Sequence, residues 1–128
     1  MKKEGSWSGR GKYFEGVGYF RNGNKDFEGL LENDLMSEFG KSYYENGNLK
    51  YVGNFENGRL DGAGTAHHWN GVIQYEGNFE AGLLEGVAEK YDFCGRFIMQ
   101  GRWKKGVMVK YLLTEEQKMH GYEILPHG

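Results

Sequence analysis

Apolar and polar side chains alternate with a period of two along much of the chain, which is the spacing of a β-strand with one face exposed to water. In the stretch YVGNFE, which begins at Tyr51, the first, third and fifth residues share one face: Tyr51, Gly53 and Phe55. The second, fourth and sixth residues, a valine, an asparagine and a glutamate, share the other. The pattern therefore predicts a strand with one apolar side.

Turn-forming residues separate these alternating segments. The residues from Asn57 to Gly62 form a turn-rich connection to a second predicted strand, Gly64 to Trp69. Asn70-Gly71 follows, and Asn-Gly is a strong hairpin signal because a type I′ turn needs positive φ at both central residues. Each unit of this kind is predicted to form two antiparallel strands.

The unit repeats. Rows of 24 residues that begin at positions 3, 27, 51, 75 and 99 align without a gap. The third position of every row is glycine, and two residues later comes a large apolar side chain, which is Trp7, Leu31, Phe55, Phe79 or Trp103. Five rows predict about ten strands in a meander, because sequential hairpins lie side by side in repeat proteins.

The predicted fold is all-β: an elongated, single-layer antiparallel β-hairpin array over residues 1–110, with residues 111–128 as a C-terminal tail. Neighbouring strands lie about 4.8 Å apart, so ten strands give a ribbon about 50 Å long. A glycine within a strand lets a neighbouring backbone or ring lie close to it. We therefore expect aromatic side chains to stack over the glycine column and form a thin core.

Composition narrows the class of protein. The chain has 22 glycines and one proline, and aromatic residues make up 16%. Collagen needs a strict Gly-X-Y repeat with proline, and disordered segments are poor in aromatics, so neither class fits. The single Cys94 cannot form an internal disulfide, and no apolar run suggests a signal peptide or a membrane-spanning helix, so a cytoplasmic location is expected.

The segments YEGNFEAGLLEG from Tyr75 and YVGNFENGRLDGAG from Tyr51 resemble the MORN (membrane occupation and recognition nexus) repeat, and YYENGNLKYVGNF from Tyr43 is similar to its bacterial variant. The resemblance covers about residues 3–110. It implies a grooved array of β-hairpins that acts as a scaffold or tether for other proteins, in some members with phospholipid binding. Row two departs from the pattern at Asp34 and Glu38, where turn glycines are expected, so its strand connection should differ in shape.

The tail lacks the 24-residue repeat. Thr114 followed by Gln117 forms a capping box, Glu115 suits the first turn of a helix, and Gly121 follows its end. A short helix is predicted at about residues 115–120. The tail's apolar residues are expected to cover the open edge of the last hairpin, or alternatively to dock on a partner: Tyr111, Leu112, Met119, Tyr122, Ile124 and Leu125.

Neither catalysis nor a metal site is indicated. Adjacent His67 and His68 point to opposite faces of a strand, and the histidines and Cys94 lack zinc spacing. A single-layer sheet offers no deep pocket in which to tune the pKa values of a carboxylate pair. The expected protein is not an enzyme and has no cofactor.

Charge distinguishes the middle of the chain from its ends. Residues 27–92 carry four Lys or Arg against twelve Asp or Glu, whereas residues 1–26 and 93–128 each carry six against three. The acidic middle disfavours nucleic acid and favours a basic segment of a partner protein. The candidate partner-binding residues are exposed aromatics and acidic residues of the middle rows: Tyr44, Tyr51, Trp69, Tyr75, Tyr91, Glu76, Glu80 and Glu85.

Other functions remain open at this stage. A peripheral membrane or phosphoinositide-binding module would use Trp103, Lys104 and Lys105 at the basic end. An antitoxin-like protein that neutralises a partner is a further alternative. A homodimer could form through a sheet edge or through the tail.

Overall fold

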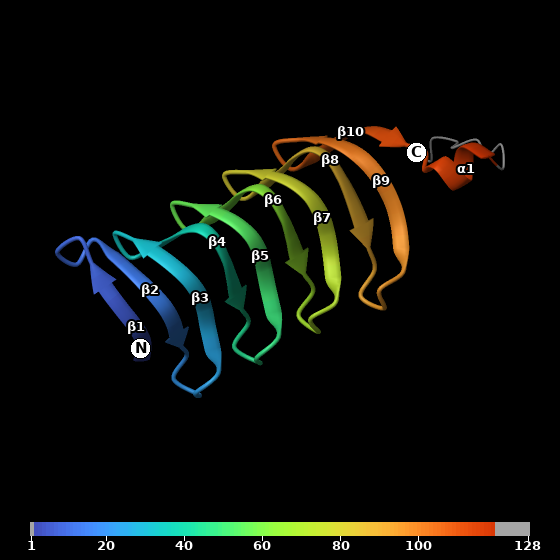
Figure 1. Cartoon of the computed structure of the whole chain (residues 1–128). Coiled ribbons are helices and arrows are strands. Elements are labelled where there is room, and N and C mark those ends of the chain that lie inside the picture. Colours follow the sequence, from blue (N-terminus) through green and yellow to red (C-terminus); the bar gives the residue numbers. More distant parts are fainter. Residues whose placement is uncertain (1, 120–128) are drawn as a thin grey trace.

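The computed structural model describes residues 2–119 and contains ten strands followed by a short helix, α1 (Figure 1). The elements are β1 (Lys2–Ser8), β2 (Tyr13–Tyr19), β3 (Lys25–Glu32), β4 (Leu35–Tyr43), β5 (Leu49–Glu56), β6 (Arg59–His67), β7 (Ile73–Glu80), β8 (Leu83–Tyr91), β9 (Phe97–Lys104), β10 (Val107–Leu112) and α1 (Glu115–Met119). All ten strands form one open antiparallel sheet in chain order. The prediction of an all-β, single-layer meander with a C-terminal helix is confirmed.

Two kinds of turn alternate along the sheet, and the sequence prediction placed them wrongly. The type I′ turn is the two-residue connection Asn57-Gly58, in which φ is 51° and 81°, so β6 starts at Arg59 with no longer connection before it. Asn70-Gly71 instead belongs to the five-residue connection 68–72, where Gly71 has positive φ and donates its N–H to His68 O. The Asn70 side chain accepts the Val72 N–H, an Asx-turn that competes with the type I′ conformation.

Row two has the same backbone as its neighbours, so the expected difference in shape is wrong. The turn Asn33-Asp34 has φ of 51° and 66°, close to the values in the glycine-containing turns. Glu38 has φ of 62° at the position where the following rows have Gly62 at 100° and Gly86 at 83°. Hydrogen bonding and packing between rows impose the conformation, and the non-glycine residues bear the strain.

Glu38→Gly is therefore expected to raise the free energy of unfolding by about 1 kcal/mol, because it relieves a left-handed residue with a Cβ. Urea denaturation measures this change. Glu56→Gly is the matched control, since Glu56 is an exposed glutamate in β5 without positive φ, and it should lose about 1 kcal/mol instead. A loss of stability in both variants would contradict the strain at Glu38.

A line of glycines crosses the sheet from β1 to β9. Cross-strand pairing joins Gly5, Gly16 and Gly29, and then Gly40, Gly53, Gly64, Gly77, Ala88 and Gly101. A Cβ at Gly53 would lie 2.5 Å from Ala63 O and 2.6 Å from the Gly64 Cα, so the backbones meet where a side chain has no room. The Phe14 ring lies over Gly5, and the Phe27 ring lies over Gly18. The other glycines of the predicted column, Gly29, Gly53, Gly77 and Gly101, meet backbone atoms or alanine and methionine side chains instead. The predicted stacking of rings over this column is therefore found only at Gly5.

The core lies on one face of the sheet. Its buried apolar residues face one another across strand pairs, as Phe55 faces Leu60 and Phe79 faces Leu84. Figure 1 shows the strands bent into arches that stack along one axis. One hollow on the apolar face is lined both by Tyr51, near the start of β5, and by Gly82, in the turn after β7. The apolar face is therefore the concave one.

Successive rows are joined at both ends of the arches. At one end, the side-chain amides of Asn22, Asn46 and Asn70 each donate to a backbone carbonyl 23 residues later, in the next five-residue connection. At the other end, the N–H of the turn residues Gly58, Gly82 and Gly106 donates to a carbonyl of the preceding row. We call the first set the asparagine ladder.

The tail begins with the predicted capping box. Thr114 N–H donates to the Gln117 side chain, and Gln117 N–H donates to the Thr114 hydroxyl, so α1 starts as expected. Tyr111 and Leu112 were predicted to cover the last hairpin, but they belong to β10 and pair with Gly101 and Gln100 of β9, so they are part of that hairpin. Met119 is 85% exposed and does not cover the hairpin. Predictions for His120, Tyr122, Ile124 and Leu125 lie outside the described residues. Within residues 2–119, no helix has the length and apolar character to cross a membrane.

Candidate functional site

The concave face holds a hollow of about 230 Å³ between the third and fourth hairpins. Two tyrosines, Tyr51 from β5 and Tyr75 from β7, stand on either side of Ala66 from β6, because the three residues are directly paired across the sheet. Buried Phe79 and Leu84 lie at the base of the hollow. We call this hollow the tyrosine groove.

Ala66 is the residue that leaves the groove open. It occupies the position between two large rings, and its methyl group fills little of the space between them. Tyr51 is 36% exposed, and Tyr75 is held at its inner edge by the Trp103 ring, with centroids 5.7 Å apart. The groove therefore presents one accessible tyrosine and one anchored tyrosine.

Two lysines sit above these rings. The Lys50 Nζ lies 5.4 Å from the Tyr51 ring centroid and 5.6 Å from that of Tyr44, which belongs to the connection after β4. The Lys90 Nζ lies 5.9 Å from the Tyr75 ring centroid, and Lys90 is directly opposite Tyr75 in the pairing. Cation–π contacts of this kind hold an ammonium over an aromatic face and leave its other side available.

The predicted partner-binding residues do not form one site. Trp69 is exposed on the connection after β6 and packs against Tyr44, with ring centroids 4.9 Å apart. Glu76, Glu80 and Tyr91 belong to the convex face, opposite the groove, as the pairing of Glu76 with Thr65 and Glu89 indicates. The sheet thus separates Tyr51 and Tyr75 from Tyr91 and from the acidic residues of the predicted set.

Glu85 has a structural contact that the sequence reasoning missed. Its carboxylate accepts the backbone N–H of Lys105, 20 residues later, at the turn of the next hairpin. Asp61 accepts the N–H of Ala81 in the same way one row earlier. The recurrence of an acidic residue at this position in two successive rows, as Asp61 and Glu85, could have indicated this contact.

The candidate lipid-binding residues also differ in their placement. Trp103 is a core residue, 9% exposed, and its indole N–H donates to Ala88 O, so it cannot insert into a bilayer in this fold. Lys104 and Lys105 are exposed at the end of the last hairpin. The basic end therefore offers lysines without the predicted tryptophan.

Both central histidines have structural hydrogen bonds. The buried His67 ring contacts the Thr65 hydroxyl at 2.9 Å and Gly71 O at 2.9 Å, and His68 Nε2 contacts Tyr91 O at 3.0 Å. Within residues 2–119, no three His, Cys, Asp or Glu side chains cluster in a way that could hold a metal ion. Cys94 is exposed in the connection after β8.

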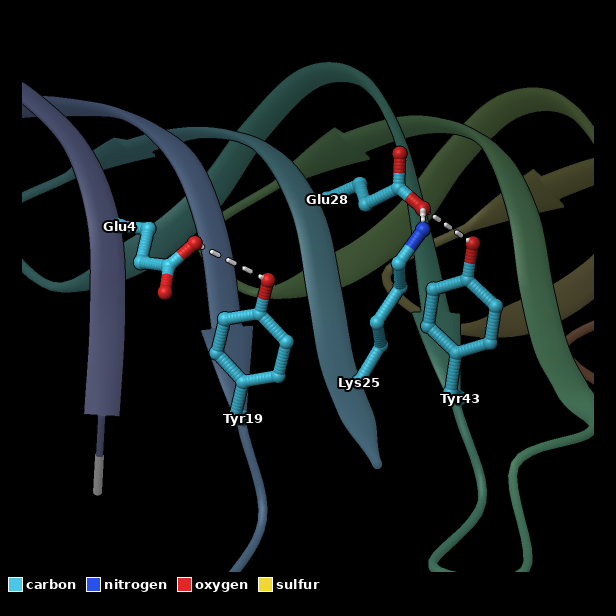
Figure 2. Close-up of polar contacts among 5 residues, drawn as sticks. All are labelled: Glu4, Tyr19, Lys25, Glu28 and Tyr43. Atoms are coloured by element: carbon cyan, nitrogen blue, oxygen red, sulfur yellow. Dashed lines mark hydrogen bonds and ion pairs between the residues drawn. The ribbon is translucent and has the colours of Figure 1, made fainter. Parts of the chain in front are cut away.

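Tyrosine–glutamate pairs recur on the convex face of the first two rows. Figure 2 shows Tyr19 donating to Glu4, and Tyr43 donating to the Glu28 carboxylate oxygen that also receives the Lys25 ammonium, at 2.6 and 2.7 Å. Burial, together with this bond to Glu28, raises the pKa of Tyr43 to about 12. Lys25 and Tyr43 together hold the pKa of Glu28 below its ordinary value.

These shifts predict a loss of stability in alkali. The bond to Glu89, together with burial, raises the pKa of Tyr91 to about 12 as well. Above pH 10 the unfolded chain releases the tyrosine protons that the folded chain retains, so their stabilising contribution, complete below pH 10, disappears as the pH rises to about 12. The urea midpoint should fall across this range, and Tyr43→Phe should make the fall shallower. An unchanged slope in that variant would contradict the shift at Tyr43.

Comparison with the known protein families and with the curated proteins gives no match to this sequence.

Proposed function

We propose that the protein is a non-catalytic scaffold or tether that holds a segment of another protein in the tyrosine groove. The observation that carries the proposal is the arrangement of Tyr51 and Tyr75 around the small Ala66 on a concave face. Tyrosines give a large contact area at a low cost in conformational entropy and are enriched in the residues that dominate protein interfaces. The resemblance to MORN repeats supports the same class of function, in a cytoplasmic setting.

The array is suited to this task because the groove is built on paired strands. Tyr51, Ala66 and Tyr75 are held by backbone pairing on both sides of each strand, so little order has to be gained when a partner binds. The membrane alternative has no comparable arrangement of side chains behind it, since Trp103 is buried.

Affinity purification from native extract tests the proposal by comparing the intact protein with Tyr51→Ser. Phe93→Ser is the matched control, because Phe93 is an exposed aromatic, 66% accessible, that lies outside the groove. A stoichiometric protein that the control retains and Tyr51→Ser loses is the expected result. A partner held equally by both variants would place binding elsewhere.

The same purification separates the alternatives. Recovery of lipid without protein, together with co-sedimentation on anionic liposomes that Lys104→Gln and Lys105→Gln abolish, would replace the scaffold with a membrane-binding module. A recovered partner that is toxic when expressed alone would identify the antitoxin-like case.

A further inference from the structure

The charges of the array are sorted between its two faces. In β5–β8, strand alternation and pairing place every acidic side chain on the convex face: Glu56, Asp61, Glu76, Glu80, Glu85 and Glu89. The lysines Lys50 and Lys90 instead hold their ammonium groups over the rings of Tyr51 and Tyr75, which line the tyrosine groove. The acidic middle of the sequence is therefore a convex acidic surface behind a basic groove.

The two lysines lack ion-pair partners of their own. Five ion pairs join side chains among residues 2–119, and neither Lys50 nor Lys90 takes part in them. The charge of Lys50 does act on Asp26: burial raises the pKa of Asp26, and the Lys50 charge opposes that rise. Their attraction stops short of an ion pair, so both ammonium groups can take an external carboxylate.

The distance between the two lysines sets the spacing of acidic residues that a bound segment would need. Lys50 lies beside Tyr51 in β5 and Lys90 is in β8, so three inter-strand steps, about 14 Å, separate their positions. An extended chain advances about 3.3 Å per residue and places residues i, i+2 and i+4 on one side. Acidic side chains four residues apart would reach the two lysines, and the residue midway between them would lie between Ala66 and Tyr75.

We propose that the tyrosine groove binds an extended acidic segment, with carboxylates four residues apart on Lys50 and Lys90 and an apolar side chain between Tyr51 and Tyr75. This inference rests on the proposed scaffold function and names the chemistry of its partner. It reverses the expectation from sequence, because the acidic residues that suggested a basic partner face away from the groove. The tyrosine rings supply contact area, and the lysines set the sign of the charge that is accepted.

An NMR titration with synthetic peptides tests the proposal, because it measures weak affinities and follows the amide of Ala66 directly. The probe is the peptide GEAFAEG, with acetylated and amidated ends. GEEFAAG has the same composition with the wrong spacing, and GKAFAKG reverses the charge. We expect GEAFAEG to bind, to shift the Ala66 resonance, and to bind more tightly than either comparison peptide.

Variants of the protein locate the charge effect. Lys50→Gln with Lys90→Gln should weaken binding of GEAFAEG about tenfold, as expected for the loss of two exposed ion pairs. Lys104→Gln with Lys105→Gln removes the same charge outside the groove and should change the affinity less than about twofold. Circular dichroism confirms that each variant is folded.

Three results would overturn the inference: no binding of GEAFAEG, tighter binding of GKAFAKG, or equal effects of the two lysine pairs. The scaffold function is judged separately. If a native partner is lost by Tyr51→Ser but kept by the Lys50→Gln and Lys90→Gln double variant, the scaffold stands and its acidic ligand does not.

Discussion

Gly53→Ala is expected to destabilise the array by about 3–4 kcal/mol, a large part of the stability of a typical domain. The added Cβ would lie 2.5 Å from a backbone carbonyl oxygen and 2.6 Å from the Gly64 Cα, and φ at Gly53 is 147°, so steric overlap and backbone strain act together. Neither contact atom is a flexible side chain that could move away. The urea midpoint of the purified variant measures the loss.

Gly86→Ala is the matched control for this prediction. Gly86 also lies in a strand of the array and has φ of 83°, but a Cβ there would meet no atom within 4 Å. Only the cost of a left-handed alanine remains, about 1 kcal/mol. Equal losses in the two variants would mean that the glycine line reflects backbone conformation and not the close approach of strands.

Phe55→Ala is expected to cost about 3–5 kcal/mol, the usual range for truncating a buried phenylalanine. Phe55 is 4% exposed and faces Leu60 on the concave side of the sheet. In a single layer of strands, the cavity left behind has no second layer to fill it. Thermal or urea unfolding measures the change.

Phe39→Ala provides the comparison on the convex face. Phe39 is 62% exposed and is paired with Asn54, the residue before Phe55, so its side chain points away from the core. Its truncation should change stability by less than about 0.5 kcal/mol. A large loss of stability in Phe39→Ala, with a small loss in Phe55→Ala, would contradict the placement of the core on the concave face.

The sequence predicts the sheet well because the evidence is repeated five times. The glycine column and the large apolar residue two positions later fix the strand spacing, and the structure has strands at those positions. The turns were predicted less well, because Asn-Gly occurs at two places in the same row. Asn57-Gly58 forms the type I′ turn, whereas Asn70 uses its side chain to bond the next connection.

The candidate site could be predicted only in part. Tyr51 and Tyr75 belong to the predicted repeat and line the groove, but Lys50 was not among the candidates. Strict alternation places neighbouring residues on opposite faces. The pairing shifts at this point, since Ser42 is opposite Tyr51 and Tyr43 is opposite Leu49, so Lys50 is an extra residue in a bulge and reaches the same rings as Tyr51.

The asparagine ladder bears on how the chain folds as it is made. Asn22, Asn46 and Asn70 each donate to a carbonyl that is synthesised 23 residues later. Because every strand also pairs only with its neighbours in the chain, a hairpin can form as soon as it emerges, but its connection is completed only by the hairpin that follows. During synthesis, each new row therefore completes the hydrogen bonds of the row before it.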